Sequence, residues 1–139
     1  MKRIIRVIWT GVFILTACSV GEGSSRVDPN ATLAPVPEEF AGLINPFGTD
    51  ATAVAAGAQV FRTNCETCHG AQGRGDGPAG QSLNPPPGNL ARLQAEAGDD
   101  YLFWRIHDGK SGTAMVAWKG ILTDEQIWQL VAFIRTLEE

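Results

Sequence analysis

The chain has 139 residues, of which 44% are hydrophobic and 19% charged, and its formal net charge is −4. This length and composition suit one globular domain with appendages and exclude several sizeable domains. The acidic balance argues against a nucleic-acid partner, because phosphate binding requires a basic surface.

The N-terminus, residues 1–17, has the organisation of a secretory signal peptide. It is basic over residues 2–6 and almost wholly apolar over residues 7–17, a stretch too short to span a membrane comfortably. Residues 15–18 read LTAC and resemble the lipobox of bacterial lipoproteins, which implies cleavage before Cys18 and a diacylglycerol on its sulfur. This segment has two alternative interpretations, an ordinary signal peptide with a stray cysteine and an uncleaved membrane anchor. Cleavage removes three basic residues, which leaves 8 basic and 15 acidic ones and a net charge of −7.

Residues 18–48 are expected to form a tether between this anchor and a domain over residues 49–139. The tether is rich in Gly, Ser and Pro and has no helical or strand period. Its second half is unusually apolar for a linker, since flexible linkers are poor in large apolar residues. These apolar side chains are Val36, Phe40, Leu43, Ile44 and Phe47. We expect them to pack on a neighbouring subunit, or else on the domain that follows.

The first helix of the domain is expected over residues 51–64, with Thr49 or Asp50 as its N-cap. Its inward face is predicted from the helical spacing of apolar and small residues. This face comprises Val54, Gly57, Ala58 and Phe61. It leads directly to a cysteine motif at residues 65–69.

Three further helices are expected after a glycine-rich run at 70–80 and a proline-rich extended stretch at 83–90. A short helix covers residues 90–97, and another runs from 99 or 100 through 107 and ends at Gly109. The last helix begins at the capping box Thr123-Asp124-Glu125-Gln126. Its apolar positions are Ile127, Leu130, Val131, Ile134 and Leu137. No segment alternates like a strand, so an all-α fold is predicted.

The motif Cys65-Glu66-Thr67-Cys68-His69 reads C-x-x-C-H, the pattern by which a c-type haem is attached. Two thiols three residues apart can add to the two vinyl groups of one porphyrin as thioethers. The next residue, His69, then lies under the iron and can supply an imidazole nitrogen. The sequence therefore predicts one covalently bound haem c.

Two other interpretations of this motif are weaker. A zinc site needs four ligands, and the remaining candidates, Cys18 and His107, are unpaired in the sequence. A thioredoxin-like redox pair belongs near a βαβ pattern, which the chain lacks.

From about Gly57 to Leu137 the chain resembles the class I monohaem cytochromes c, in particular bacterial oxidase-subunit-like members. The resemblance rests on G-x-x-x-F-x-x-x-C at 57–65, G-D-G-P at 75–78, G-T-A-M at 112–115 and L-x-x-F at 130–133. It implies an all-α fold of three to five helices around one haem, with the last helix crossing the first at its glycine. One departure is Val116, where many members have a proline after the methionine.

Met115, His107 and an open site are the candidates for the sixth iron ligand. Met1 is lost with the signal, and His107 lies within an apparently continuous helix. Met115 lies in a loop, and the resemblance also assigns it as the ligand. A soft thioether stabilises Fe(II) and raises the reduction potential.

The resemblance further implies that a backbone carbonyl near Pro78, or near Pro86 or Pro87, accepts a hydrogen bond from Nδ1 of His69. Pro78, Leu90, Trp104 and Trp118 are predicted to contact the haem, with Phe103 and Ile106 also on the pocket wall. General core packing is the competing interpretation for each of these. Arg74 and Arg105 are candidates to pair with haem propionates, or else are solvated surface charges.

With both axial positions filled, the iron exchanges electrons and binds no substrate. We therefore expect a membrane-anchored electron-transfer protein on the periplasmic side of a membrane, not an enzyme in its own right. The preferred interpretation is a haem subunit of a respiratory or photosynthetic complex, resembling those of oxidases or alternative complex III. The alternatives are a free tethered electron shuttle and a gas-binding or peroxidase-like protein with an open sixth site.

Overall fold

The computed structural model describes residues 33–139. The predictions for the signal peptide and for Cys18 lie outside these residues. The described part contains helices and one isolated bridge between Lys119 and Leu122, but no strand. None of its helices is long and apolar enough to cross a membrane. The predicted all-α class is confirmed for this part of the chain.

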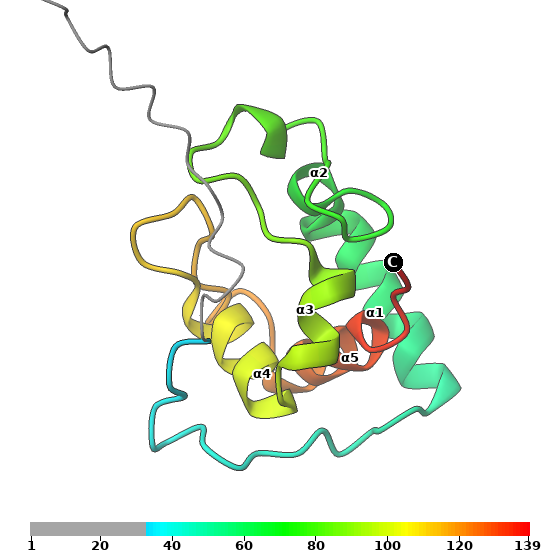
Figure 1. Cartoon of the computed structure of the whole chain (residues 1–139). Helices are drawn as coiled ribbons and strands as arrows, with labels where there is room; N and C mark the ends of the chain where they lie inside the picture. The colour runs from blue at the N-terminus through cyan, green and yellow to red at the C-terminus, as the bar shows by residue number, and fades with distance from the viewer. Residues whose placement is uncertain (1–32) are drawn as a thin grey trace, which may run out of the picture. The chain divides into compact units, whose positions relative to one another are not determined.

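Helix α1 (Ala51–Asn64) packs against helix α5 (Asp124–Ile134), and Figure 1 shows the two crossing. The crossing point is Gly57, where an added Cβ would overlap the backbone carbonyl of Gln129. Beside it the rings of Phe61 and Phe133 lie 5.1 Å apart. The resemblance-based prediction of a crossing at this glycine therefore holds.

The caps and inward face of α1 follow the sequence with one correction. Asp50 caps the helix by accepting a hydrogen bond from the backbone N–H of Ala53 at 2.8 Å. The buried face is Ala53, Gly57 and Phe61, whereas Val54 and Ala58 of the predicted face are only half-buried. Ala53 replaces Val54 because the face that meets α5 follows the i, i+4, i+8 row through Gly57.

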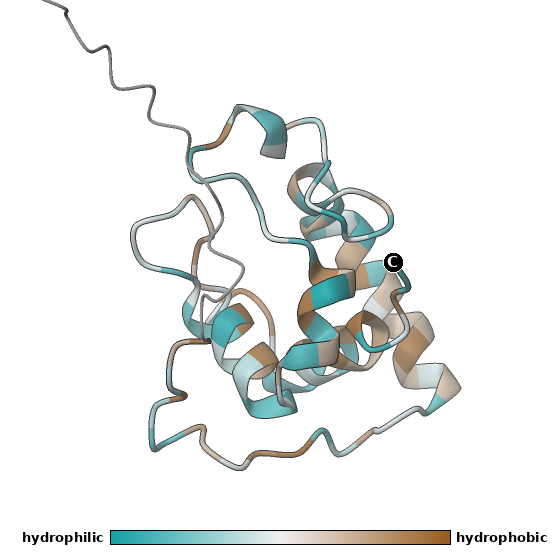
Figure 2. Ribbon diagram, in the orientation of Figure 1, coloured by the Kyte–Doolittle hydropathy of each residue, from teal (hydrophilic) through white to brown (hydrophobic). Residues whose placement is uncertain are grey.

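Helix α3 (Leu90–Glu96) and helix α4 (Asp99–Asp108) lie against the other side of α5. The α4–α5 contact includes a stack of the Phe103 and Trp128 rings, 4.2 Å between centroids. The capping box at Thr123 is fully formed, with reciprocal hydrogen bonds to Gln126. Figure 2 shows the apolar stretches of these helices interleaved with polar ones, as expected for helices that each bury one face.

One arginine joins the ends of α3, α4 and α5. Arg135 donates to Asp99 at 2.6 Å and to the backbone carbonyl of Ala97 at 2.8 Å, and it also bonds the carbonyl of Gln94. Its planar guanidinium suits several simultaneous acceptors. This arrangement satisfies carbonyls that the short helix α3 leaves open at its C-terminus.

Residues 33–48, which we call the N-terminal strap, pack on the helical domain for part of their length. Phe40 is buried, with its ring centroid 6.1 Å from that of Phe103 and 5.2 Å from that of His107. Asn45 donates to the carbonyl of Trp128, and its backbone N–H donates to Asp99, both at 3.0 Å. The domain itself therefore covers part of the apolar stretch that the sequence analysis assigns to the tether.

Candidate haem-binding site

The C-x-x-C-H motif forms a single helical turn, α2 (Glu66–His69), that continues the direction set by α1. The backbone N–H groups of Cys68 and His69 both donate to the carbonyl of Cys65, at 3.1 and 2.9 Å. Residues three and four apart on a helix share one face, so the two thiols and the imidazole are presented together. Both thiols are free and partly buried.

Burial, together with the nearby Cys68, raises the pKa of the Cys65 thiol to about 12. Disulfide exchange requires a thiolate, so this environment disfavours a redox pair at neutral pH. Among residues 33–139 no group of three or more His, Cys, Asp or Glu side chains is placed to hold a metal ion. The environment of Cys65 therefore argues against the thioredoxin-like interpretation of the motif.

The glycine-rich run wraps around α2 and supports it. Gly75 N–H donates to the carbonyl of His69 at 2.8 Å, and Ala79 N–H donates to that of Thr67 at 3.0 Å. At Gly77 an added Cβ would lie 2.5 Å from the Thr67 carbonyl, which excludes any larger residue. Gly77 is therefore explained by close backbone contact with the motif, and Gly75 by its positive φ and its close approach to the carbonyl of Pro87.

The surroundings of His69 suit an iron ligand. Its Nδ1 is buried and makes no close hydrogen bond within the described residues. Burial lowers the pKa of His69, and the nearby Gly88 backbone, which accepts from the imidazole, acts in the opposite direction. Gly88 directly follows the prolines named in the sequence analysis, whereas Pro78 is exposed. A neutral, buried imidazole is the form that ligates iron, so the residue fits a haem.

Met115 lies in the loop between α4 and α5. We call residues 109–118 the methionine loop. The Met115 side chain is partly buried and packs against the hydrophobic core, as do Trp104, Trp118 and Leu90.

His107, the other sixth-ligand candidate, contacts an acidic and an aromatic side chain. Its Nδ1 lies 2.8 Å from Asp108 Oδ1, and its ring stacks on Phe103.

Arg105 is a further residue whose surroundings fit an anionic group. Its guanidinium carbon lies 3.8 Å from the centre of the Trp104 ring, and its Nε is buried without a hydrogen-bond partner among the described residues. Buried polar atoms are normally paired, so an unpaired Nε calls for a partner such as a haem propionate. Arg74, the other propionate candidate, is exposed.

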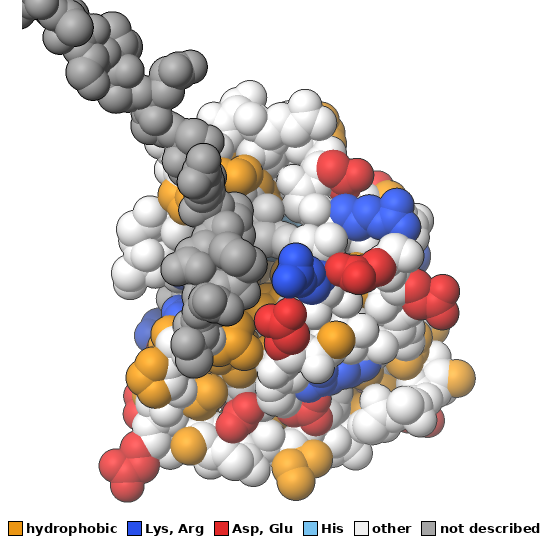
Figure 3. All heavy atoms as spheres, viewed as in Figure 1, with side chains coloured by type: hydrophobic (Ala, Val, Ile, Leu, Met, Phe, Trp, Pro, Cys, Tyr) orange, Lys and Arg blue, Asp and Glu red, His pale blue; other side chains and the backbone are white. Residues whose placement is uncertain are grey.

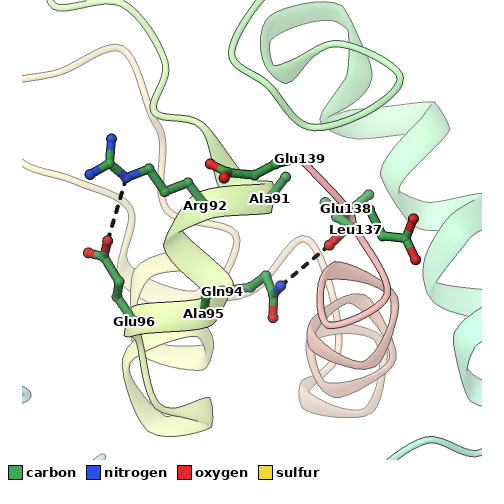
Figure 4. Close-up of a pocket in the computed structure, with 8 residues that line it drawn as sticks. All are labelled: Ala91, Arg92, Gln94, Ala95, Glu96, Leu137, Glu138 and Glu139. Atoms are coloured by element: carbon green, nitrogen blue, oxygen red, sulfur yellow. Dashed lines mark hydrogen bonds and ion pairs between the residues drawn. The ribbon is translucent and has the colours of Figure 1, made fainter.

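The hollows elsewhere on the domain do not compete with this site. Figure 4 shows one between α3 and the C-terminus, where the Gln94 side-chain amide donates to the carbonyl of Leu137 at 3.4 Å and an Arg92–Glu96 pair lies on the outer side of α3. None of the predicted haem-contacting residues lines it. Figure 3 shows acidic and basic side chains intermixed on this face, which is ordinary solvated surface.

The helical arrangement, the C-x-x-C-H turn and the loop methionine define a class I cytochrome c. Residues 52–134 match the family described as "Cytochrome C oxidase, cbb3-type, subunit III". The chain belongs to this family, which carries covalently bound haem c and transfers electrons. The spacing of Cys65 and Cys68 is the one such attachment requires.

A curated relative is the cbb3-type cytochrome c oxidase subunit CcoP of Azospirillum brasilense, 29% identical over 99 residues. The match covers 71% of this chain and 33% of that protein, so the chain spans about a third of the length of the curated relative.

Two solved structures share the fold. The reducing HAO-like protein complex Kustc0457/Kustc0458 of Kuenenia stuttgartiensis matches with a TM-score of 0.59 and 24% identity, over 70% of this chain and 48% of that one. Cytochrome CL of Methylophaga aminisulfidivorans matches with a TM-score of 0.56 and 24% identity, over 81% and 72%.

Sequence reasoning missed three features of the site. It did not single out Gly88 beside the imidazole, the unpaired Nε of Arg105, or the hydrogen bonds of Thr113 to the methionine loop. For Gly88, a signal was available in the sequence, since it directly follows Pro86 and Pro87. The other two depend on side-chain geometry that residue spacing does not encode.

Proposed function

We propose that this protein is a membrane-anchored cytochrome c that passes single electrons, with His69 and Met115 as the axial ligands of its haem. The bound haem supplies one-electron chemistry at its iron. The observation that carries the proposal is the buried, unpaired Nδ1 of His69 on the same helical turn as the two free thiols. In the bound state that nitrogen needs an acceptor, and the Gly88 backbone is the candidate.

Two observations support Met115 as the sixth ligand. The side chain packs toward the core from a loop that α4 and α5 hold at both ends. The alternative, His107, pairs with Asp108, and its ring centroid lies 5.2 Å from that of Phe40 and 5.7 Å from that of Phe103. Ligation through Nε2 would keep the pair with Asp108 but would require the ring to move away from Phe40 and Phe103.

Around the haem, we assign Trp104, Trp118 and Leu90 to the pocket wall, and Arg105 to a propionate. An apolar wall excludes water, and together with His/Met ligation this stabilises Fe(II). Pro78 contributes through its loop, whose glycines contact α2. We assign electron transfer, the role that family membership supports, and no reaction of its own.

The anchoring and location rest on the N-terminal sequence. We propose that residues 1–17 are removed, that Cys18 carries the lipid, and that residues 49–139 form the domain on the periplasmic face. Cys18→Ala should then accumulate as unprocessed precursor. Isolation of the native mature protein with Met1 intact and no lipid would instead indicate an uncleaved protein anchor.

We further propose that the protein is a subunit of a respiratory electron-transfer complex. Family membership and the likeness to an oxidase subunit support this role. Leu43 and Ile44, 38% and 80% exposed, remain available to a neighbouring subunit after Phe40 has packed on the domain. A free tethered shuttle is the second candidate, and co-purification of other subunits from solubilised membranes distinguishes the two.

The ligand assignment is tested with two variants of the oxidised holoprotein. Met115→Ala should abolish the far-red sulfur-to-iron absorption band and lower the reduction potential. His107→Ala should retain the band. Loss of the band in His107→Ala but not in Met115→Ala would reverse the assignment.

A further inference from the structure

We propose that Thr113 is the positioning residue for Met115, and that its hydroxyl sets how readily a competing ligand displaces the thioether from iron. The inference rests on the proposed Met115 ligation and extends it to a residue that is not itself a ligand. Three observations on the methionine loop carry it.

The first is that the Thr113 hydroxyl bridges two points of the loop. It donates to the carbonyl of Lys110 at 2.7 Å and accepts from the backbone N–H of Met115 at 3.1 Å. A threonine hydroxyl has one proton to donate and lone pairs to accept with, so both roles are filled at once. The N–H of Met115 is thus held by a side chain.

The second is that the Met115 carbonyl is also held, so both of its backbone polar groups are bonded within the loop. Lys110 N–H donates to that carbonyl at 3.1 Å. Gly109, with φ of +72°, lies close to the backbone of Met115. An added Cβ there would lie 2.6 Å from the same carbonyl oxygen, so only a glycine allows this approach. The two bonds together fix the backbone from which the thioether extends.

The third is that the next residue provides no rigidity of its own. A proline at position 116 would fix its own φ near −65° and restrict Met115 to extended conformations. This chain has Val116, which is 59% exposed. The Thr113 hydroxyl therefore does by hydrogen bonding what a proline would do by covalent restriction.

A separate set of contacts joins the two ends of the methionine loop. The backbone N–H groups of Trp118 and Lys119 donate to the carbonyl of His107 at 3.1 and 3.0 Å, and Lys119 Nζ lies 3.0 Å from Asp108 Oδ1. These contacts do not involve Thr113. Its removal should therefore loosen the ligand within the loop and leave the ends of the loop in place.

The experiment titrates imidazole into the oxidised full-length holoprotein and follows loss of the far-red band. Thr113→Val keeps the shape of the side chain and removes the hydroxyl, so it should bind imidazole about tenfold more tightly, equivalent to about 1.4 kcal/mol. Thr113→Ser retains the hydroxyl and should stay within about threefold of the parent protein. If Thr113→Val yields no holoprotein, Thr113→Ala provides the same comparison.

The matched control is Thr136→Val, which removes an exposed hydroxyl that donates to the Phe133 carbonyl at 2.7 Å, outside the methionine loop. Thr136→Val should lose about as much stability as Thr113→Val, but its affinity for imidazole should equal that of the parent protein. Unchanged affinity in Thr113→Val, or equal affinities in Thr113→Val and Thr113→Ser, would overturn the role of the hydroxyl. Absence of the far-red band in the parent protein would instead overturn the ligation by Met115.

Discussion

The N-terminal strap provides the sharpest test of how the domain is built. Phe40 is 9% exposed and lies against Phe103 and His107, whereas Ile44, four residues later, is 80% exposed. We predict that Phe40→Ala destabilises the domain strongly and that Ile44→Ala does not. The two substitutions lie on the same strap and differ mainly in the burial of the side chain removed.

The magnitude follows from burial. Phe→Ala in a core costs about 3–5 kcal/mol, of which part is the cavity left behind. Phe40 lies on a segment outside the helices that can relax toward the gap, so we expect the cost to be reduced to about 2–3 kcal/mol. Ile44 buries only about a fifth of its side chain, so its loss should cost about 0.5 kcal/mol or less.

Urea unfolding of the full-length holoprotein, monitored by far-ultraviolet circular dichroism, measures the loss of stability in both variants. For a slope of about 1.5 kcal/mol/M, Phe40→Ala should lower the midpoint by about 1–2 M. Equal, small shifts for the two variants would mean that the strap is a linker that merely touches the domain, and the reasoning from burial would be refuted.

Three further predictions concern the crossing, the pocket and one surface carboxylate. Gly57→Ala should cost about 3 kcal/mol or more in urea unfolding, because its Cβ would overlap backbone of α5; a cost below about 1 kcal/mol would contradict this. Arg105→Gln should lower the reduction potential by roughly 20–60 mV, because a positive charge near the haem is lost. Spectroelectrochemical titration measures this shift, and Arg74→Gln, at an exposed arginine, is the control. Equal shifts in the two variants would rule out a propionate role for Arg105. The hydrogen bond from Lys119 holds the pKa of Asp108 below its usual range, so the carboxylate contributes stability above about pH 4 that is lost as the pH falls through the folded pKa. Asp108→Asn should therefore cost at most about 0.5–1 kcal/mol at pH 7 and nothing at strongly acidic pH, by urea unfolding across that range; a pH-independent difference would contradict the ionic origin.

The helices were predictable because their signals are local. The N-cap Asp50 and the capping box at Thr123 mark the starts of α1 and α5, and Gly109 marks the end of α4. The C-x-x-C-H turn was predictable because its chemistry requires a fixed spacing. These features depend on residues close together in the chain.

The features that were missed depend on contacts between distant segments. The apolar residues of the strap did not reveal whether their partner was Phe103 of the same domain or a neighbouring subunit, because hydrophobic burial has no directional preference. The inward face of α1 shifted from Val54 to Ala53 because the crossing with α5 decided it. The Thr113 bridge arises from the path of a loop with glycines at positive φ.

Carbon monoxide binding to the reduced protein tests the central claim most directly. If His69 and Met115 occupy both axial positions, the reduced parent protein should show no rapid formation of a carbonyl complex, whereas Met115→Ala should bind carbon monoxide at once. Rapid and stoichiometric binding by the parent protein would show an open or exchangeable sixth site and contradict the assignment of an electron-transfer haem.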